Sequence, residues 1–376
     1  MDSMRVLIDA TAARDGGALT DFAAILPELD RRLAASDDAR VLADENLIKY
    51  FGSSEMKLSF EGRPVGSGVS RLKWIFRGMP TATREYGADV LLAGQFVTGQ
   101  PKVPYLLRLT EPGLVDPAYS RSLTHLSPKE RLGVTVKKRM FRRSAKSAHS
   151  IICATNAIAD CLLSRIPDVP KNRIIVSPFG LSPIVAGVKA RHKFNGTRRL
   201  LTMHATAHKN IEVILEALAT PQMKEYSLSI MADLSHPATK YQQYLATRIK
   251  EMGLGSRVKS LGFLRSNEAV VKQMLEHDAL IVPSITETWS HGVIEGMALG
   301  MPVIASDIPC HREVSAGAAW LTPTDNPVAL SEVVAKLESE DDERRRRLEL
   351  GLEIVSKLSW GRHASDIVDS LRDAVA

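Results

Sequence analysis

The chain has 376 residues, of which 44% are hydrophobic and 24% charged, with a formal net charge of +6. This length is sufficient for two α/β domains, and this composition excludes general disorder. Its three cysteines, Cys153, Cys161 and Cys310, are scattered without zinc-type spacing, which favours a reduced, cytoplasmic setting. No run approaches the roughly 18 apolar residues that span a bilayer, and the first residues lack a signal-peptide pattern.

The first 180 residues alternate apolar strand patterns with helical patterns. Residues 5–10 (RVLIDA) predict a buried first strand, and a loop from Thr11 to Gly17 leads into a helix that begins near Leu19. Further apolar segments predict strands at 89–93, 104–109, 149–154 and 173–177. Strands that alternate with helices form parallel, doubly wound sheets. Residues 1–180 are therefore expected to form one Rossmann-like α/β domain.

A basic segment, residues 129–146, lies within this half and carries eight bases against one acid, Glu130. On a helical wheel most of the bases share one arc, beside an apolar stripe of Leu132, Val136 and Met140. Such a helix can lie on an anionic membrane, at about 1 kcal/mol per basic residue. The residues proposed for that surface are Lys138, Arg139, Arg142 and Arg143.

A solvated helix whose stripe packs on the core explains the same pattern equally well, so both interpretations stay open. Nucleic-acid binding is less favoured, because aromatic residues make up only 5% of the chain and no stacking platform is visible.

A proline-containing break at 178–183 and a polar stretch at 189–198 precede a second series of elements. Strands are predicted at 199–203, 227–232, 257–261, 279–283 and 302–305, and helices at 210–218, 239–252, 267–276, 292–299 and 326–338. Residues 181–358 are expected to form a second Rossmann-like domain. The charge-balanced run 337–348 predicts a solvated helix face, and residues 359–376 predict an amphipathic terminal helix.

Two glutamates eight positions apart, Glu287 and Glu295, are the most informative residues of the chain. Glu287 falls just past the strand 279–283, where open α/β sheets bind ligands. Glu295 falls in the first turns of the following helix, whose N-terminus favours phosphate. Either glutamate alone is most simply an ordinary surface residue. The string that carries both of them, from Pro283 to Pro309, is far more specific.

Lys209 and Asn210 end a second motif, residues 201–210 (LTMHATAHKN), where a predicted strand runs into a helix. A lysine at such a turn can meet a phosphate as a point charge, aided by the helix N-terminus. Taken alone, a solvated lysine at a helix start is the simpler interpretation.

The string from Pro283 to Pro309 resembles the E-x7-E signature of family 4 retaining glycosyltransferases. The shared features are Pro-Ser, the run Glu-Gly-Met-Ala-x-Gly-x-Pro-Val, and Ala-Ser-Asp-Ile-Pro. Gly296 stands where an alanine is usual. The resemblance covers nearly the whole chain and is strongest over 199–315. It implies an α/β fold of GT-B architecture, with two Rossmann-like doubly wound domains facing a central cleft and residues 359–376 crossing back to the first domain.

In the resembling family the C-terminal domain holds the donor, a nucleotide-diphosphate sugar. The N-terminal domain holds the acceptor of that sugar. The resemblance therefore implies a catalytic set of Glu287 on the transferred sugar, Lys209 on the diphosphate, and His291. It also implies that Glu295 binds the nucleotide ribose. The other donor-binding residues that it implies are Gly16, Gly17, His204, Asn210, Phe263, Leu264, Thr288, Trp289 and Ser290.

Two positions depart from the family's pattern. The family binds the diphosphate with a Gly-Arg…Lys-Asn motif. His204 occupies the place of that arginine and no glycine precedes it, so His204 or His208 is a candidate to supply the second positive charge on the diphosphate. No His-Asp pair follows the strand 104–109; Glu111 takes the acidic place, as an acceptor residue or as an ordinary loop carboxylate.

The implied reaction moves a sugar from a UDP- or GDP-sugar to a glycan or lipid-linked acceptor, with retention, in cell-surface polysaccharide synthesis. It implies no cofactor and no metal, and the chain has no D-x-D cluster. A peripheral location at the inner face of the cytoplasmic membrane follows if residues 129–146 bind lipid. Two alternatives stay open: a GT-B nucleotide-sugar epimerase, and a non-catalytic GT-B partner or membrane-surface binding protein.

Overall fold

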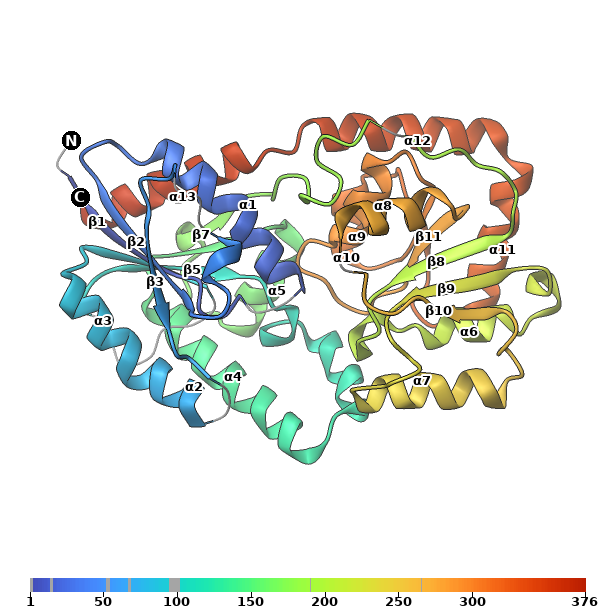
Figure 1. Ribbon diagram of the computed structural model, residues 1–376, viewed down its shortest axis with the longest axis horizontal. Coiled ribbons are helices and arrows are strands. Elements are labelled where there is room, and N and C mark those ends of the chain that lie inside the picture. The colour runs from blue at the N-terminus through green and yellow to red at the C-terminus, as the bar shows by residue number, and fades with distance from the viewer. Residues whose placement is uncertain are drawn as a thin grey trace. The chain divides into compact units, whose positions relative to one another are not determined.

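The computed structural model divides into two compact units (Figure 1). It describes residues 3–13, 16–51, 55–66, 69–94, 102–189, 191–264 and 266–376. The first unit comprises residues 1–115, 134–180 and 359–376, and the second comprises residues 116–133 and 181–358. Asp15, in the predicted loop from Thr11 to Gly17, lies outside the described residues.

The first unit is built on a parallel sheet in the order β3-β2-β1-β4-β5-β6-β7. Its strands are β1 (Arg5–Asp9), β2 (Asp38–Asp44), β3 (Ser59–Arg63), β4 (Val90–Ala93), β5 (Tyr105–Leu109), β6 (Ser150–Cys153) and β7 (Ile174–Val176). Alternate residues enter two separate cores, with Leu7 and Leu91 in one and Ile8 and Leu92 in the other. Both faces of the sheet are therefore covered, as continuous apolar strands require.

Helices of the first unit supply the other side of each core. They are α1 (Gly16–Arg32), α2 (Val69–Lys73), the π-helical η2 (Trp74–Gly78), α3 (Met79–Tyr86), α5 (Asn156–Arg165), α13 (Trp360–Val375) and, from residue 134 onward, α4 (Pro128–Ser147). α1 and α13 contribute to one core, and α3, α4 and α5 to the other. In α13, Ala364, Ile367 and Leu371 recur at helical spacing and are fully buried, so the terminal helix packs within the first unit.

The second unit repeats this construction with strand order β10-β9-β8-β11-β12-β13, all parallel. Its strands are β8 (Arg199–Met203), β9 (Ser227–Met231), β10 (Val258–Ser260), β11 (Ala279–Val282), β12 (Val303–Ser306) and β13 (Trp320–Thr322). Its helices are α6 (Glu212–Leu218), α7 (Lys240–Glu251), α8 (Asn267–Leu275), α9 (His291–Ala298), α10 (Pro309–Ser315), α11 (Pro327–Ser339) and α12 (Asp341–Ser356). The predicted fold class, two doubly wound α/β sheets, is confirmed.

The differences from the sequence prediction are local. β2, β3, β13 and α10 were not predicted, and α1 begins at Gly16 rather than near Leu19. β13 has three residues, too few for a periodic pattern, and α10 has only two turns. Residues 116–133, which the sequence prediction includes in the first domain, pack with the second unit.

Helix α9 lies close against β11 and β12 because residue 296 has no side chain. A Cβ atom at Gly296 would lie 2.5 Å from Cγ2 of Val303 and 3.3 Å from Cδ2 of Leu280. A Cβ atom at Gly292, in the same helix, would lie 3.5 Å from Cγ2 of Val282, which is an ordinary contact. Val303 thus fills the space that an alanine at position 296 would need.

Gly296→Ala is expected to lower the free energy of unfolding. Overpacking costs about 1–3 kcal/mol, which outweighs the gain in helix propensity of up to about 1 kcal/mol. The matched control, Gly292→Ala, should leave stability unchanged or raise it, and Gly296→Ala combined with Val303→Ala should recover part of the loss. Urea denaturation measures all three variants. Equal stabilisation by both alanines would contradict the packing argument.

Candidate functional site

Lys209 and Glu287 form an ion pair at the carboxyl edge of the second sheet. The short 3₁₀ helix η6 (Ala207–Lys209) follows β8, and Glu287 follows β11. These two strands are neighbours at the point where the strand order reverses, which is where open α/β sheets bind ligands. Nζ of Lys209 donates to Oε1 of Glu287 at 2.5 Å, and the two side chains are 20% and 10% exposed. The two motifs predicted from the sequence therefore meet.

The charge state of Glu287 is set by its partner. Burial raises the pKa of this carboxyl, but the Lys209 ammonium acts in the opposite direction and prevails, so the pKa lies at about 2. Glu287 is consequently ionised at neutral pH. Removing one member of such a pair leaves the other as an uncompensated buried charge.

Helix α9 begins without a side-chain cap. Ser290, its N-cap residue, has a left-handed backbone (φ 64°, ψ 68°), and its hydroxyl does not bond to the first helical N–H groups. The hydroxyl contacts Nε2 of His311 at 2.9 Å instead. The first N–H groups of a helix carry partial positive charge and have no partner within the helix, so this end of α9 suits an anion.

His311 holds Ser290 in this conformation. It is fully buried, and its Nδ1 lies 2.9 Å from the carbonyl oxygen of Ser306, so Nδ1 carries the proton and Nε2 accepts from Ser290. Burial lowers the pKa of His311 to about 4, which keeps the ring neutral. The Ser306 hydroxyl donates in turn to the carbonyl of Ser284. The sequence analysis missed this histidine; the available signal was its position two residues after Pro309.

Glu295 and its neighbours are buried in the same region. Glu295 is 3% exposed, and its carboxylate makes no hydrogen bond or ion pair with another described residue. Thr288 and Trp289 are buried at 7% and 4% exposure, and His291 is half-buried as the first residue of α9. These predicted residues lie on one loop and helix with Glu287.

The residues between β8 and α6 differ from the family's diphosphate-binding motif, in which an arginine stands at the place of His204. His204 follows β8 with a left-handed backbone (φ 58°), and its side chain is exposed. Burial, and then the nearby Lys209, lower the pKa of His208 to about 4, so it supplies no second positive charge at neutral pH. Nδ2 of Asn210 donates to the carbonyl of Thr324 at 2.7 Å. That amide thus binds the protein's own backbone.

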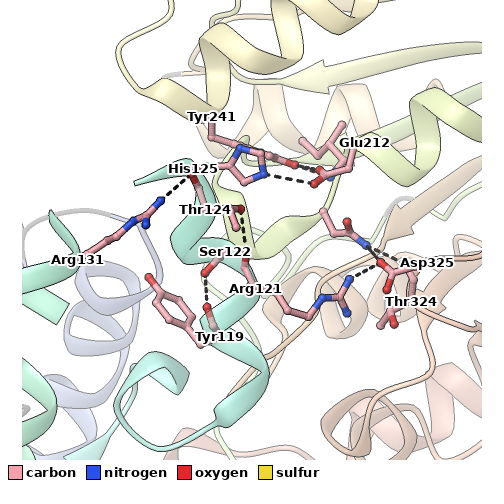
Figure 2. Close-up of polar contacts among 12 residues, drawn as sticks. Tyr119, Arg121, Ser122, Thr124, His125, Arg131, Glu212, Tyr241, Thr324 and Asp325 are labelled. Atoms are coloured by element: carbon pink, nitrogen blue, oxygen red, sulfur yellow. Dashed lines mark hydrogen bonds and ion pairs between the residues drawn. The ribbon is translucent and has the colours of Figure 1, made fainter. Parts of the chain in front are cut away.

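Residues 116–125, which we call the strap, brace both loops of the site. Asp116 accepts a hydrogen bond from the hydroxyl of Thr286, the residue before Glu287. Figure 2 shows Arg121 paired with Asp325, the residue that follows the carbonyl bonded by Asn210. The ring of Tyr119 lies 6.1 Å from that of His208.

The far end of the strap is anchored on α6 and α7. The ring of His125 lies 5.0 Å from that of Tyr241 and 3.8 Å from the carboxylate of Glu212 (Figure 2). The ring of Tyr244 lies 4.8 Å from that of His125. The hydroxyl of Tyr241 also donates to Glu212. The strap escaped sequence analysis because its 3₁₀ helix η4 (Pro117–His125) has neither the helical nor the strand period.

Phe263 lies on the same sheet edge, in the loop after β10. Its side chain is 83% exposed, and Leu264 beside it is half-buried. β10 is separated from β8 by one strand, which corresponds to roughly 10 Å across a sheet. A ligand that extends from Lys209 along the sheet edge would have to be of about that length to reach Phe263.

The remaining predicted residues belong to the first unit and to α4. Gly16 and Gly17 open α1, and Glu111 accepts from Lys137 at 3.3 Å through both oxygens. On α4, Arg139, Arg142 and Arg143 are exposed and Lys138 is half-buried. Leu132 and Val136 are 64% and 41% exposed, whereas Met140 is buried, so only part of the predicted stripe packs on the core. Among the described residues, no helix is long and apolar enough to cross a membrane.

Residues 189–350 match the family model of glycosyl transferases group 1. The chain therefore carries a glycosyl transferases group 1 domain, and this domain includes Lys209, Glu287 and Glu295. An uncharacterized glycosyltransferase of Methanocaldococcus jannaschii, MJ1178, is 23% identical over 222 residues, a match that spans 58% of each chain.

Solved glycosyltransferases share the fold over almost the whole chain. Sucrose-phosphate synthase of Thermosynechococcus elongatus superposes with a TM-score of 0.72 at 15% identity, covering 98% of both chains. A glycosyltransferase of Rickettsia africae gives 0.71 at 14% identity, covering 100% of this chain and 99% of its own. Anabaena Alr3699/HepE in complex with UDP-glucose gives 0.69 at 17% identity, covering 98% and 100%. The two Rossmann-like units are those of a GT-B glycosyltransferase fold.

Glu287→Gln is expected to lower stability in a pH-dependent way. Because the folded pKa of Glu287, about 2, lies below its ordinary value of 4.5, the ionised carboxylate stabilises the fold fully above pH 4.5. This contribution, on the order of 3 kcal/mol, is lost as the pH falls towards 2. The difference in unfolding free energy between wild type and variant should therefore be large at pH 7 and smaller at pH 3.

Urea denaturation at both pH values measures that difference, with Glu276→Gln, an exposed site, as control. A difference that stays constant between pH 7 and pH 3 would show that the ion pair with Lys209 does not stabilise the fold.

Proposed function

We propose that the protein is a retaining glycosyltransferase that moves a sugar from a nucleotide-diphosphate sugar to a glycan or lipid-linked acceptor. The observation that carries the proposal is the Lys209–Glu287 pair at the switch point of the second sheet, beside the uncapped start of α9. The solved complex of Anabaena Alr3699/HepE with UDP-glucose, which has the same fold, supports a nucleotide-sugar donor.

In this proposal the donor diphosphate binds between Lys209 and the N-terminus of α9. The ammonium and the first N–H groups of the helix stabilise the charge that develops on the departing diphosphate. Lys209 then exchanges part of its interaction with Glu287 for the phosphate oxygens. Glu287, ionised and close by, accepts hydrogen bonds from hydroxyls of the transferred sugar. His291 and the backbone of 289–291 line the sugar and phosphates, and no metal takes part.

The nucleoside is proposed to extend from Lys209 along the sheet edge. Glu295 is buried and has no side-chain partner among the described residues, so its carboxylate is available for the two ribose hydroxyls. The exposed ring of Phe263, with Leu264, would cover the base. UDP- and GDP-sugars both fit this arrangement, because stacking on an aromatic ring discriminates weakly between bases.

The acceptor is proposed to bind to the first unit. Glu111 is the residue proposed for the acceptor, whereas Gly16 and Gly17 at the start of α1, which allow a ligand to approach the backbone closely, are proposed for the donor. An acceptor carried on a lipid suits the exposed bases and apolar residues of α4, and would assign the protein to cell-surface polysaccharide synthesis at the inner face of the cytoplasmic membrane.

Glu295→Gln should weaken binding of UDP or GDP by about 1–3 kcal/mol, the range for a charged hydrogen bond. Lys209→Ala should weaken binding of the diphosphate more than that of the nucleoside, because its partner is the phosphate. Calorimetry with UDP, GDP and uridine measures both effects, with the exposed Lys224→Ala as control. Unchanged affinity in folded Glu295→Gln would exclude the ribose role, and equal loss of UDP and uridine affinity in Lys209→Ala would make the lysine structural.

Release of free sugar from UDP-glucose separates an active transferase from a non-catalytic protein.

Replacing Lys138, Arg139, Arg142 and Arg143 by glutamine should abolish sedimentation with vesicles that contain anionic lipid. The wild type should pellet at low salt and less at high salt, since charges are screened over about 8 Å at physiological ionic strength. The control removes four exposed bases elsewhere: Lys336, Arg345, Arg346 and Lys357. Leu132→Ser with Val136→Ser should weaken pelleting without removing its salt dependence. A wild type that never pellets with anionic vesicles would favour a soluble acceptor.

A further inference from the structure

The hydrogen bond between Asp116 and Thr286 joins the strap to the residue that precedes Glu287. Both partners belong to the second unit, although 170 positions separate them in the chain. Thr286 is buried, with 1% of its surface exposed, and its hydroxyl donates to Oδ2 of Asp116. A hydrogen bond to a carboxylate is about twice as strong as one between neutral groups. Asp116 therefore fixes a side chain next to Glu287 more firmly than a neutral acceptor would.

The same carboxylate also fixes the start of the strap. Oδ1 of Asp116 accepts from the backbone N–H of Ala118 at 2.8 Å and so caps the 3₁₀ helix η4. One side chain thus binds its own helix with one oxygen and the loop of Glu287 with the other. As a result, the loop cannot move away from η4 without breaking the hydrogen bond to Thr286.

The strap contacts the residue that precedes each member of the ion pair in the candidate site. On one side it binds Thr286, and on the other the ring of Tyr119 lies 6.1 Å from that of His208. The two loops are also joined directly, because the backbone N–H of Ile285 donates to the carbonyl oxygen of His208 at 2.9 Å. The ion pair therefore lies beside a junction of three segments, one of which is the strap.

A second polar contact of the strap, the ion pair of Arg121 with Asp325, is a weaker constraint. Its side chains are 45% and 57% exposed (Figure 2). Exposed ion pairs contribute little to stability, because water and salt screen them. The hydrogen bond of Asp116 reaches a buried partner and is screened much less. Of these two contacts, the one made by Asp116 is consequently expected to matter for the ion pair in the site.

We propose that Asp116 is a positioning residue that holds Glu287 opposite Lys209 through Thr286. Glu287 has to lie within hydrogen-bond reach of the Lys209 ammonium and, in the proposed reaction, of the transferred sugar. A displacement of about 1 Å can cost roughly a hundredfold in rate even when the substituted residue is far from the chemistry. The effect on the ion pair does not depend on the proposed glycosyltransferase function, whereas the effect on sugar transfer rests on it.

A double-mutant cycle tests the effect on the ion pair. Urea denaturation of wild type, Lys209→Met, Glu287→Gln and the double variant gives the coupling free energy between the two side chains. The cycle is repeated in Asp116→Ala and in Thr286→Val, either of which removes the contact. The coupling should fall to about half or less, because the Coulomb energy halves when the separation grows from 2.5 Å to about 5 Å. In Arg121→Gln, the control on the same strap, the coupling should stay unchanged.

Turnover tests the effect on catalysis. Asp116→Ala and Thr286→Val should each lower kcat for release of sugar from UDP-glucose by about ten- to a hundredfold. Binding of UDP should stay close to that of wild type, since UDP lacks the sugar that Glu287 is proposed to contact. Both substitutions together should cost no more than one, because they remove the same contact. Thr286→Ser, which keeps the hydroxyl, should retain most of the activity.

Two results would overturn the proposal. One is a coupling between Lys209 and Glu287 that keeps its wild-type value in both Asp116→Ala and Thr286→Val, which would make Asp116 a purely stabilising residue. The other is a wild-type kcat in both variants. If Asp116→Ala does not fold, Thr286→Val decides, because valine keeps the shape of threonine.

Failure of the proposed function would be visible separately. A wild type that releases no sugar from UDP-glucose or GDP-glucose would contradict the transferase activity. The coupling measurement needs no ligand, so it would then decide the positioning role of Asp116 by itself.

Discussion

The ion pair of Lys209 and Glu287, held largely out of water, constrains the loops at the carboxyl edge of the second sheet. The desolvation of Lys209 and Glu287 is compensated only if their geometry is maintained, because a misplaced partner leaves a buried charge unpaired. The two residues come from different loops, one after β8 and one after β11. Much of the structure around them fixes those loops: His311 binds Ser290, Asp116 binds Thr286, and Asn210 binds Thr324.

The backbone near this pair is also under strain. Three residues other than glycine that have positive φ angles lie on these loops: His204, Asn210 and Ser290. Such conformations cost of order 1–3 kcal/mol each and persist only where surrounding contacts over-determine them. Asn210 tolerates the left-handed region through its short polar side chain, whereas Ser290 depends on His311. The strain is concentrated where a ligand would approach the backbone.

The sequence predicted the parts of this arrangement that local pattern determines. Alternating strands and helices gave both sheets, and the spacing of Glu287 and Glu295 led to one loop and its helix. Lys209 could be matched to that loop only through the family resemblance, because its pairing with Glu287 depends on β8 and β11 being neighbours. The contacts of His311 and Asp116 were not predictable, since they join residues distant in sequence through side-chain geometry. Gly296 illustrates the same limit: it stands where the resembling family has alanine, yet Val303 occupies the space of the missing methyl group.

Two cations at the carboxyl edges of the two sheets, the half-buried Lys209 and the buried Arg108, are stabilised in different ways. Lys209 has a carboxylate at 2.5 Å, so the unliganded site is electrically balanced and a phosphate must share the lysine with Glu287. Arg108 has the ring centroids of Phe22 and Phe179 at 4.8 and 5.5 Å and no hydrogen-bond acceptor among the described residues. A ring face attracts a cation but accepts little hydrogen bonding from it.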